Sequence, residues 1–251
     1  ALFGAFTDAI KEAVIEAGKN ASDLAEQFNG VLNVADPRNL VGLMIGAAVV
    51  FMFSGLAINA VSRAAGAVVQ EVRHQFEKHP GIMKGTEKPE YGAVVDICTR
   101  DSLRELSVPG VLAVMAPIAV GFGLGVGALG AYLAGAIATG TLMAVFLANS
   151  GGAWDNAKKM VEDGHHGGKH SDAHAATVVG DTVGDPFKDT AGPAINPLIK
   201  VMNLVGLLVT PLIVKLSLED KGTTSMAIAF VAAFIIVGGL VQNRRKSTSI
   251  A

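Results

Sequence analysis

Residues 180–200, "GDTVGDPFKDTAGPAINPLIK", combine carboxylates, amines and an amide immediately before and inside an apolar stretch. On a regular helix of about 100° per residue, these polar side chains fall within a sector of roughly 120°. They are Asp181, Asp185, Lys188, Asp189, Asn196 and Lys200. Carboxylates that repeat every four residues repel one another unless a cation lies between them. Hard oxygen ligands suit Mg²⁺, which is often shared with substrate phosphates, so the stripe predicts a magnesium–phosphate site. A helix end with solvated charges is the alternative.

A second cluster lies in "NSGGAWDNAKK", residues 149–159, at the end of a long uncharged stretch. Asp155 is three residues before Lys158 and four before Lys159, so the three side chains share one face of a helix. One interpretation is that Trp154 and the lysines only anchor a membrane span at the interface. Because both clusters are expected on the same side of the membrane, we predict that the second cluster forms another wall of the same site.

Four histidines follow in "DGHHGGKHSDAH": His165, His166, His170 and His174. Their spacing matches no strong metal-binding pattern, although a metal site is conceivable. The glycine, serine and aspartate content favours a flexible connector. His174 is the histidine nearest to the aspartate-bearing stretch.

The composition points to an integral membrane protein. The 251 residues are 51% hydrophobic and only 17% charged, against about 25% charged in soluble domains. The net charge of −2 argues against nucleic acid as a partner. A single cysteine, Cys98, excludes an internal disulfide and a cysteine metal cage.

The hydrophobic pattern predicts an all-α transmembrane bundle whose small residues allow close helix packing. We place five spans near 40–61, 108–127, 131–153, 185–214 and 224–241. We expect an exposed surface helix at 7–28, an amphipathic helix at 62–79, and a turnover at 121–130. We also expect a polar loop with short helical parts at 80–107 and a hydrophilic loop at 155–180. Fourteen of the 20 Lys and Arg residues lie in 62–107, 155–188 and 242–251, which predicts that these segments are cytosolic. We expect a multi-pass membrane protein, located in a prokaryotic inner membrane.

The two clusters closely resemble the C-terminal signatures of the membrane-bound, ion-translocating pyrophosphatases. "EVRHQFEKHPGIMKGTEKPEY" and "VPGVLAVMAPIAVG" resemble the segments of that family that lie before the clusters, so the resemblance covers essentially the whole chain. It implies a homodimer of subunits with about sixteen or seventeen membrane helices in concentric rings. Residues 1–251 would form the C-terminal part of one such domain and would be inactive alone.

The resemblance also implies hydrolysis of magnesium pyrophosphate at a cytosolic site, coupled to pumping of H⁺ or Na⁺, with K⁺ as a possible further cofactor. Asp155, Asp181 and Asp185 would ligate Mg²⁺. Lys158 and Lys188 would contact pyrophosphate, with Lys159 a weaker candidate. Asp189 would help to position and deprotonate the attacking water, together with an aspartate outside this chain. Lys200 would belong to an ion gate, and Asn196 would line the passage above it.

Two other classes of function remain possible from the residues. A secondary cation transporter would explain the aspartates and Lys200 but leaves the lysines suited to phosphate, Lys158 and Lys188, without a role. A magnesium-dependent membrane phosphotransferase would explain the metal cluster but gives Lys200, well below the site, nothing to do. Uptake of ions energised by pyrophosphate separates both from a pump.

Overall fold

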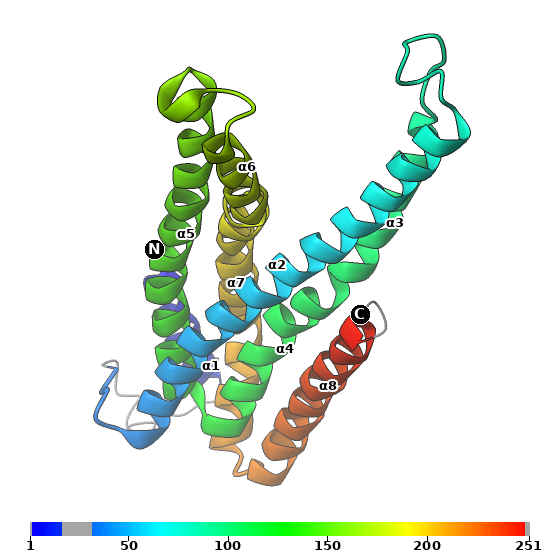
Figure 1. Cartoon of the computed structure of the whole chain (residues 1–251). Helices are drawn as coiled ribbons and strands as arrows, with labels where there is room; N and C mark the ends of the chain where they lie inside the picture. The colour runs from blue at the N-terminus through cyan, green and yellow to red at the C-terminus, as the bar shows by residue number, and fades with distance from the viewer. Residues whose placement is uncertain (1, 17–31, 249–251) are drawn as a thin grey trace.

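The computed structural model describes residues 2–16 and 32–248, with side chains for 4–16 and 32–244, and within these residues the chain forms helices and no strand. Figure 1 shows these helices in chain order. They are α1 (Leu2–Glu16), α2 (Pro37–Lys78), α3 (Tyr91–Glu105), α4 (Ser107–Leu124), α5 (Val126–Glu162), the 3₁₀ turn η2 (His165–Gly167), α6 (Asp172–Asp185), the π-helical turn η3 (Pro186–Ala191), α7 (Gly192–Leu218) and α8 (Gly222–Thr248).

The prediction of an all-α membrane bundle is confirmed. Five helical segments of the described chain are long and apolar enough to cross a membrane, and four of the predicted spans each lie inside one of them. The span predicted at 108–127 extends three residues too far, because α4 ends at Leu124 and the chain turns at Gly125. Two of the segments are composite, because α3 continues into α4 and α6 continues through η3 into α7. The limits of each span within its helix stay predictions.

Several helices are much longer than the bilayer is thick. The 42 residues of α2 and the 37 residues of α5 extend over about 63 and 56 Å, against about 30 Å of hydrocarbon. In Figure 1 the C-terminal half of α2 with α3, and the end of α5 with α6, project from the same end of the molecule and diverge. The segments richest in Lys and Arg therefore lie at one end, as the predicted topology requires.

Glycines bring α2 and α5 into close contact. A Cβ atom on Gly42 would lie 2.3 Å from the carbonyl oxygen of Ala128, and one on Gly46 would lie 2.1 Å from that of Tyr132. Close backbone approach of this kind is how helices associate where lipid provides no hydrophobic driving force.

The expected turnover is also present: α4 ends at Leu124, and Gly125 adopts a φ of 97° before α5 begins.

The loop predicted at 155–180 is wrong because that segment is largely helical, and the segment 80–107 is more helical than the short parts predicted there. Residues 91–105 form α3, and of 155–180 only 163–171 lie outside α5 and α6. The drop in hydrophobicity along the sequence marks where the chain leaves the membrane, not where the helix ends. A helix can continue into water because its backbone hydrogen bonds lie within the helix.

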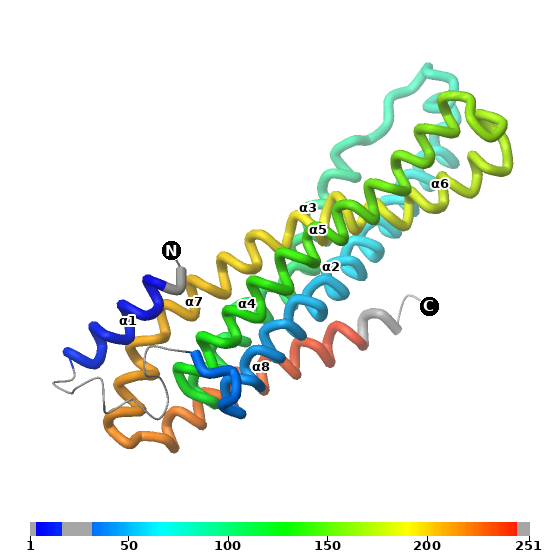
Figure 2. Tube along the Cα trace, turned by 90° about the vertical axis from the view of Figure 1, so that its left-hand side faces the viewer, coloured from blue at the N-terminus to red at the C-terminus, as the bar shows by residue number. Residues whose placement is uncertain are grey.

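The predicted exposed helix at 7–28 is helical but only partly exposed in the part that the structure describes. Phe6, Ile10 and Val14 of α1 are buried, and α1 packs against α7. Figure 2 shows α1 lying along α7. The charged residues between these positions face outward, so α1 is an amphipathic helix with one buried and one exposed face. Residues 17–28 lie outside the described part of the chain.

Candidate active site

The contact between α5 and α6 is built on glycines that face each other across the two helices. A Cβ atom on Gly151 would lie 2.5 Å from the carbonyl oxygen of Gly184. The indole of Trp154 lies against α6, since a Cβ atom on Gly180 would be 2.2 Å from its Cε3. Because glycine has no side chain, the backbones of α5 and α6 touch at this point. The charged residues on the two helices therefore meet between them.

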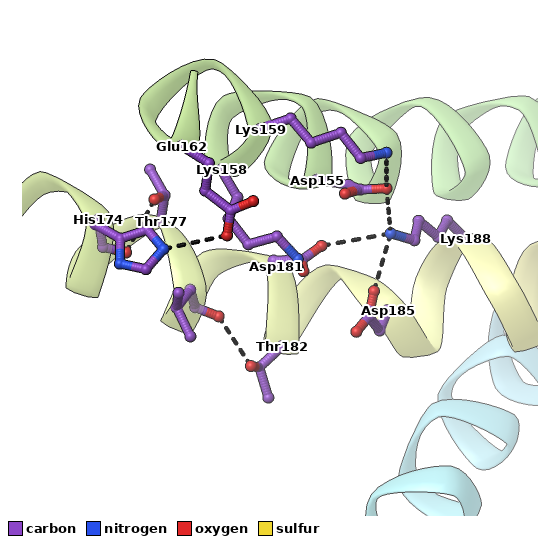
Figure 3. Close-up of polar contacts among 11 residues, drawn as sticks. Asp155, Lys158, Lys159, Glu162, His174, Thr177, Asp181, Thr182, Asp185 and Lys188 are labelled. Atoms are coloured by element: carbon purple, nitrogen blue, oxygen red, sulfur yellow. Dashed lines mark hydrogen bonds and ion pairs between the residues drawn. The ribbon is translucent and has the colours of Figure 1, made fainter. Parts of the chain in front are cut away.

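Lys188 lies at the centre of the charged cluster (Figure 3). Its Nζ atom is 2.9 Å from Asp155 Oδ2 on α5, 3.4 Å from Asp181 Oδ1 and 2.9 Å from Asp185 Oδ1, both on α6. The Lys188 side chain is only 17% exposed and that of Asp181 only 10%. One ammonium thus holds three carboxylates from two helices at a poorly solvated position.

Two further lysines complete an alternating arrangement of charge. Lys158 on α5 donates to Asp181 across the helix pair, and Lys159 Nζ is 3.1 Å from Asp155 Oδ2 on its own helix. Each carboxylate of α5 and α6 in this cluster therefore has an ammonium neighbour. The structure brings together the two clusters that the sequence predicted to share one site.

A π-helical turn presents Lys188 to this cluster. In η3 the N–H of Gly192 donates to the carbonyl of Phe187, five residues earlier, in place of the usual four. Pro186 and Pro193 have no N–H, so an unbroken α-helical hydrogen-bond pattern is impossible through this segment. The turn lies between these two prolines, since Pro186 is its first residue and Pro193 follows its C-cap, Gly192.

The π-helical turn corrects the regular stripe that we predicted over residues 181–200. One additional residue in a turn makes everything after it lag by about 100° relative to a regular helix. Lys200, predicted about 100° from Asp181, therefore falls close to the direction of Asp181. The polar residues still share a side of the α6–η3–α7 segment, but the register that unites them depends on η3.

Asp189, Asn196 and Lys200 do not join the cluster around Lys188. All three are exposed in the described part of the chain, where Asp189 and Lys200 make no ion pair with another described residue. They occupy positions on η3 and α7 that follow Lys188 toward the membrane interior.

One pair of residues at the site was missed from the sequence. His174 Nε2 lies 3.2 Å from Glu162 Oε1 and so joins the polar ends of α6 and α5. The His174 Nδ1 atom accepts the N–H of His170, which assigns the proton of the neutral ring to Nε2. Glu162 is four residues after Lys158 and therefore lies on the same helix face. This spacing in the sequence could have identified Glu162 as a residue near the site.

Comparison with known proteins decides the family. The family model described as inorganic H⁺ pyrophosphatase matches residues 1–209 of the 251. The chain belongs to the inorganic H⁺ pyrophosphatase family. The match includes both charged clusters and all of the site residues named above.

Relatives within this pyrophosphatase family match most or all of the chain. A K⁺-insensitive pyrophosphate-energized proton pump of Streptomyces avermitilis is 67% identical over 100% of this chain, and one of Chloroflexus aurantiacus is 50% identical over 100%. A putative K⁺-stimulated pyrophosphate-energized sodium pump of Bacteroides thetaiotaomicron is 49% identical over 74%. The chain spans 32% of the length of the first two relatives and 26% of the third.

The donor set of this pyrophosphatase-family site fits Mg²⁺ shared with a substrate more closely than a closed metal cage. Asp155, Asp181 and Asp185 supply hard oxygen ligands around the Lys188 ammonium, yet across the described residues no three carboxylate, imidazole or thiol groups are placed to hold a metal ion by themselves. Mg²⁺ is usually held by one or two carboxylates, with waters and phosphate oxygens filling the other positions. Among the described residues the histidine loop holds no such group either, and its role as a connector stays a prediction.

Proposed function

We propose that this chain forms the C-terminal part of a membrane pump that hydrolyses magnesium pyrophosphate on its cytosolic side and uses the energy to move ions. The observation that carries this proposal is the interleaved cluster in which Lys188 contacts Asp155, Asp181 and Asp185. Pyrophosphate is small and highly charged, so its recognition depends on cations. The lysines supply ammonium groups, and the carboxylates beside them would hold Mg²⁺.

Each residue of the cluster then has a defined task. Lys158 and Lys188 bind phosphate oxygens, with Lys159 at the exposed edge. When an anion draws these ammonium groups toward itself, the carboxylates of Asp155, Asp181 and Asp185 are left to hold Mg²⁺. Bound Mg²⁺ would supply charge neutralisation at the phosphate oxygens.

Asp189 is the candidate for orienting the attacking water and accepting its proton. It follows Lys188 directly but lies outside the ion pairs, so its carboxylate is not occupied by an ammonium of the described chain. An accessible carboxylate beside bound phosphate is suited to general-base work.

The same helical segment offers a route from hydrolysis to transport. Lys200 is 11 residues beyond Asp189, about 16 Å along a helix. A change of charge at Asp189 during hydrolysis therefore acts on an ammonium two to three turns deeper in the membrane, with Asn196 between them. We propose Lys200 as part of the ion gate.

For the ion we propose H⁺, without a requirement for K⁺. Two relatives that match the full chain are named as K⁺-insensitive proton pumps, whereas the relative named as a sodium pump matches 74% of the chain. We further propose a homodimer in a prokaryotic inner membrane, with the α5–α6 end in the cytosol, because the segments richest in Lys and Arg lie at that end.

Ion uptake into sealed vesicles tests the function. The full-length protein containing this chain should acidify the vesicle interior when Mg²⁺ and pyrophosphate are added outside, with the same rate in K⁺ and in choline buffers. A secondary cation transporter would move ions down an imposed gradient and ignore pyrophosphate. A phosphotransferase would consume pyrophosphate only with an acceptor lipid and build no gradient.

A further inference from the structure

Thr141 on α5 carries a hydroxyl within an uncharged helical stretch, and no role described above uses it. Its Oγ1 donates to the carbonyl of Ile137 at 2.8 Å, which commits the hydroxyl proton and leaves the oxygen lone pairs as acceptors. The side chain is exposed in the described part of the chain. A polar group inside a membrane helix is costly when it faces lipid, so the surface that Thr141 faces matters.

The packing of α5 on α7 determines that surface. Gly140 lies between two isoleucines of α7: a Cβ atom on Gly140 would be 2.6 Å from Ile199 Cδ1 and 3.3 Å from Ile195 Cγ2. Asn196 and Lys200 are the residues that directly follow these isoleucines. The contact therefore fixes the level in the membrane at which Asn196 and Lys200 meet α5.

Thr141 directly follows Gly140, and this order fixes its side of the helix pair. The helices α5 and α7 are antiparallel (Figure 1). In an antiparallel pair, a step of one residue after the contact position turns each side chain by about 100° toward the same side. Thr141, Asn196 and Lys200 therefore lie on one side of the α5–α7 pair and at a common level.

The register within α5 leads to the same surface independently. Thr141 is 18 residues before Lys159, which is five turns of about 3.6 residues, so the two side chains point the same way about 27 Å apart. Ala148, seven residues after Thr141, lies on the same face and leaves room beside it. This face of α5 thus runs from the charged cluster at Asp155 and Lys159 down to Thr141.

We propose that Thr141 lines the ion passage with Asn196 and Lys200, and that its hydroxyl oxygen accepts a hydrogen bond from the hydrated ion or from the water beside the Lys200 ammonium. This inference rests on the proposed function. A lysine within a membrane span faces protein or water rather than lipid, so Thr141, on the side of Lys200, faces the passage too.

Transport by the full-length protein tests the role of the hydroxyl. Thr141→Val keeps the shape and removes the acceptor, and it should lower pyrophosphate-energised uptake about tenfold, the effect of losing a hydrogen bond to a charged group. The KM for pyrophosphate should not change, because the cluster that binds it is far away. Thr141→Ser should retain uptake.

Thr99→Val is the matched control, since Thr99 Oγ1 on α3 makes the same type of bond, to the carbonyl of Val95 at 2.9 Å. Uptake by Thr141→Val within twofold of wild type overturns the proposal, as does an equal loss in Thr141→Ser or in Thr99→Val. If the wild-type protein itself shows no pyrophosphate-energised uptake, the proposed function fails. That result differs from the outcomes above, in which the wild type transports ions and only the role of Thr141 is overturned.

Thiol labelling tests the location without relying on activity. In a Cys98→Ser background, Thr141→Cys should react with a small cationic methanethiosulfonate in vesicles, because a passage contains water. Phe146→Cys, about 140° around the same helix, should react at least tenfold more slowly. The measurement is the modified fraction by mass spectrometry, and equal labelling at the two positions refutes a passage at Thr141.

Discussion

Lys188 Nζ and Asp155 Oδ2 lie 2.9 Å apart and join η3 to α5, which are separated in sequence by a loop and the whole of α6. Asp155 lies just beyond the uncharged part of α5, and Lys188 lies in the π-helical turn at the start of the predicted span in α7. The pair therefore ties the polar end of one membrane helix to the point where the other enters the bilayer. Substitutions in this region should act on hydrolysis and on transport together.

Asp185→Asn should abolish both activities of the full-length protein. The change preserves shape but removes one of the three negative charges around Lys188, which weakens binding of Mg²⁺. We expect hydrolysis and ion uptake to fall at least a hundredfold, with a higher Mg²⁺ concentration for half-maximal activity. Asp163→Asn, on the exposed loop after α5, is the control and should change little. Normal hydrolysis by Asp185→Asn would remove Asp185 from the site.

Gly151→Ala should separate the helices that form the site. The new Cβ atom would lie 2.5 Å from the carbonyl oxygen of Gly184, and backbone cannot move aside as a flexible side chain does. We expect at least tenfold slower hydrolysis and a lower Tm. Gly66→Ala on α2 is the control, because nothing lies within 4 Å of its added Cβ atom. Equal behaviour of the two variants would show that close contact of α5 and α6 is not required.

The sequence was sufficient to predict the fold class, the five spans and the meeting of the two charged clusters. These features follow from long uncharged runs and from spacing along single helices, both of which are local. The helical ends of α5 and α6 were missed because hydropathy reports the membrane boundary and not the end of the hydrogen-bonded helix. The exposure of α1 was misjudged because burial against α7 depends on tertiary packing.

The arrangement inside the site was less predictable. A regular helix over 181–200 was the simplest assumption, although Pro186 and Pro193 were visible and disfavour it. Which carboxylate pairs with which lysine depends on the approach of Gly151 to Gly184, and no pattern on one helix reveals a contact between two. The roles of Asp189, Asn196 and Lys200 stay predictions, since their surroundings extend beyond the described chain.

The loop histidines should be dispensable while His174 should not. His165, His166 and His170 are exposed, and φ angles of 52° and 72° at His166 and His170 are tolerated by asparagine. Changing all three to Asn should leave hydrolysis within about threefold if the loop is a connector. His174→Ala removes the bond to Glu162 that joins α5 to α6 and should cost at least tenfold. A hundredfold loss in the triple variant would restore the metal interpretation.

Lys188→Ala and Lys200→Ala should fail in different ways, although the two lysines share one helical segment. Lys188 lies among the carboxylates that we expect to bind Mg²⁺, so its loss should raise the KM for pyrophosphate and slow hydrolysis. Lys200 is about 18 Å further along the helix and touches none of these groups. An ammonium at this depth costs about 2.5–3.5 kcal/mol to insert, so we expect it to pair with a carboxylate of the longer protein.

The decisive quantity is the number of ions moved per pyrophosphate hydrolysed, measured on the same vesicles for both variants. Lys188→Ala should reduce the rate but leave this ratio near the wild-type value, because every pyrophosphate that is still hydrolysed passes through an intact gate. Lys200→Ala should retain a measurable hydrolysis rate while the ratio falls at least fivefold, because the charge that responds to Asp189 is gone. A wild-type ratio in Lys200→Ala means that Lys200 does not couple hydrolysis to transport, and its ammonium then serves to hold α7 against a neighbouring helix.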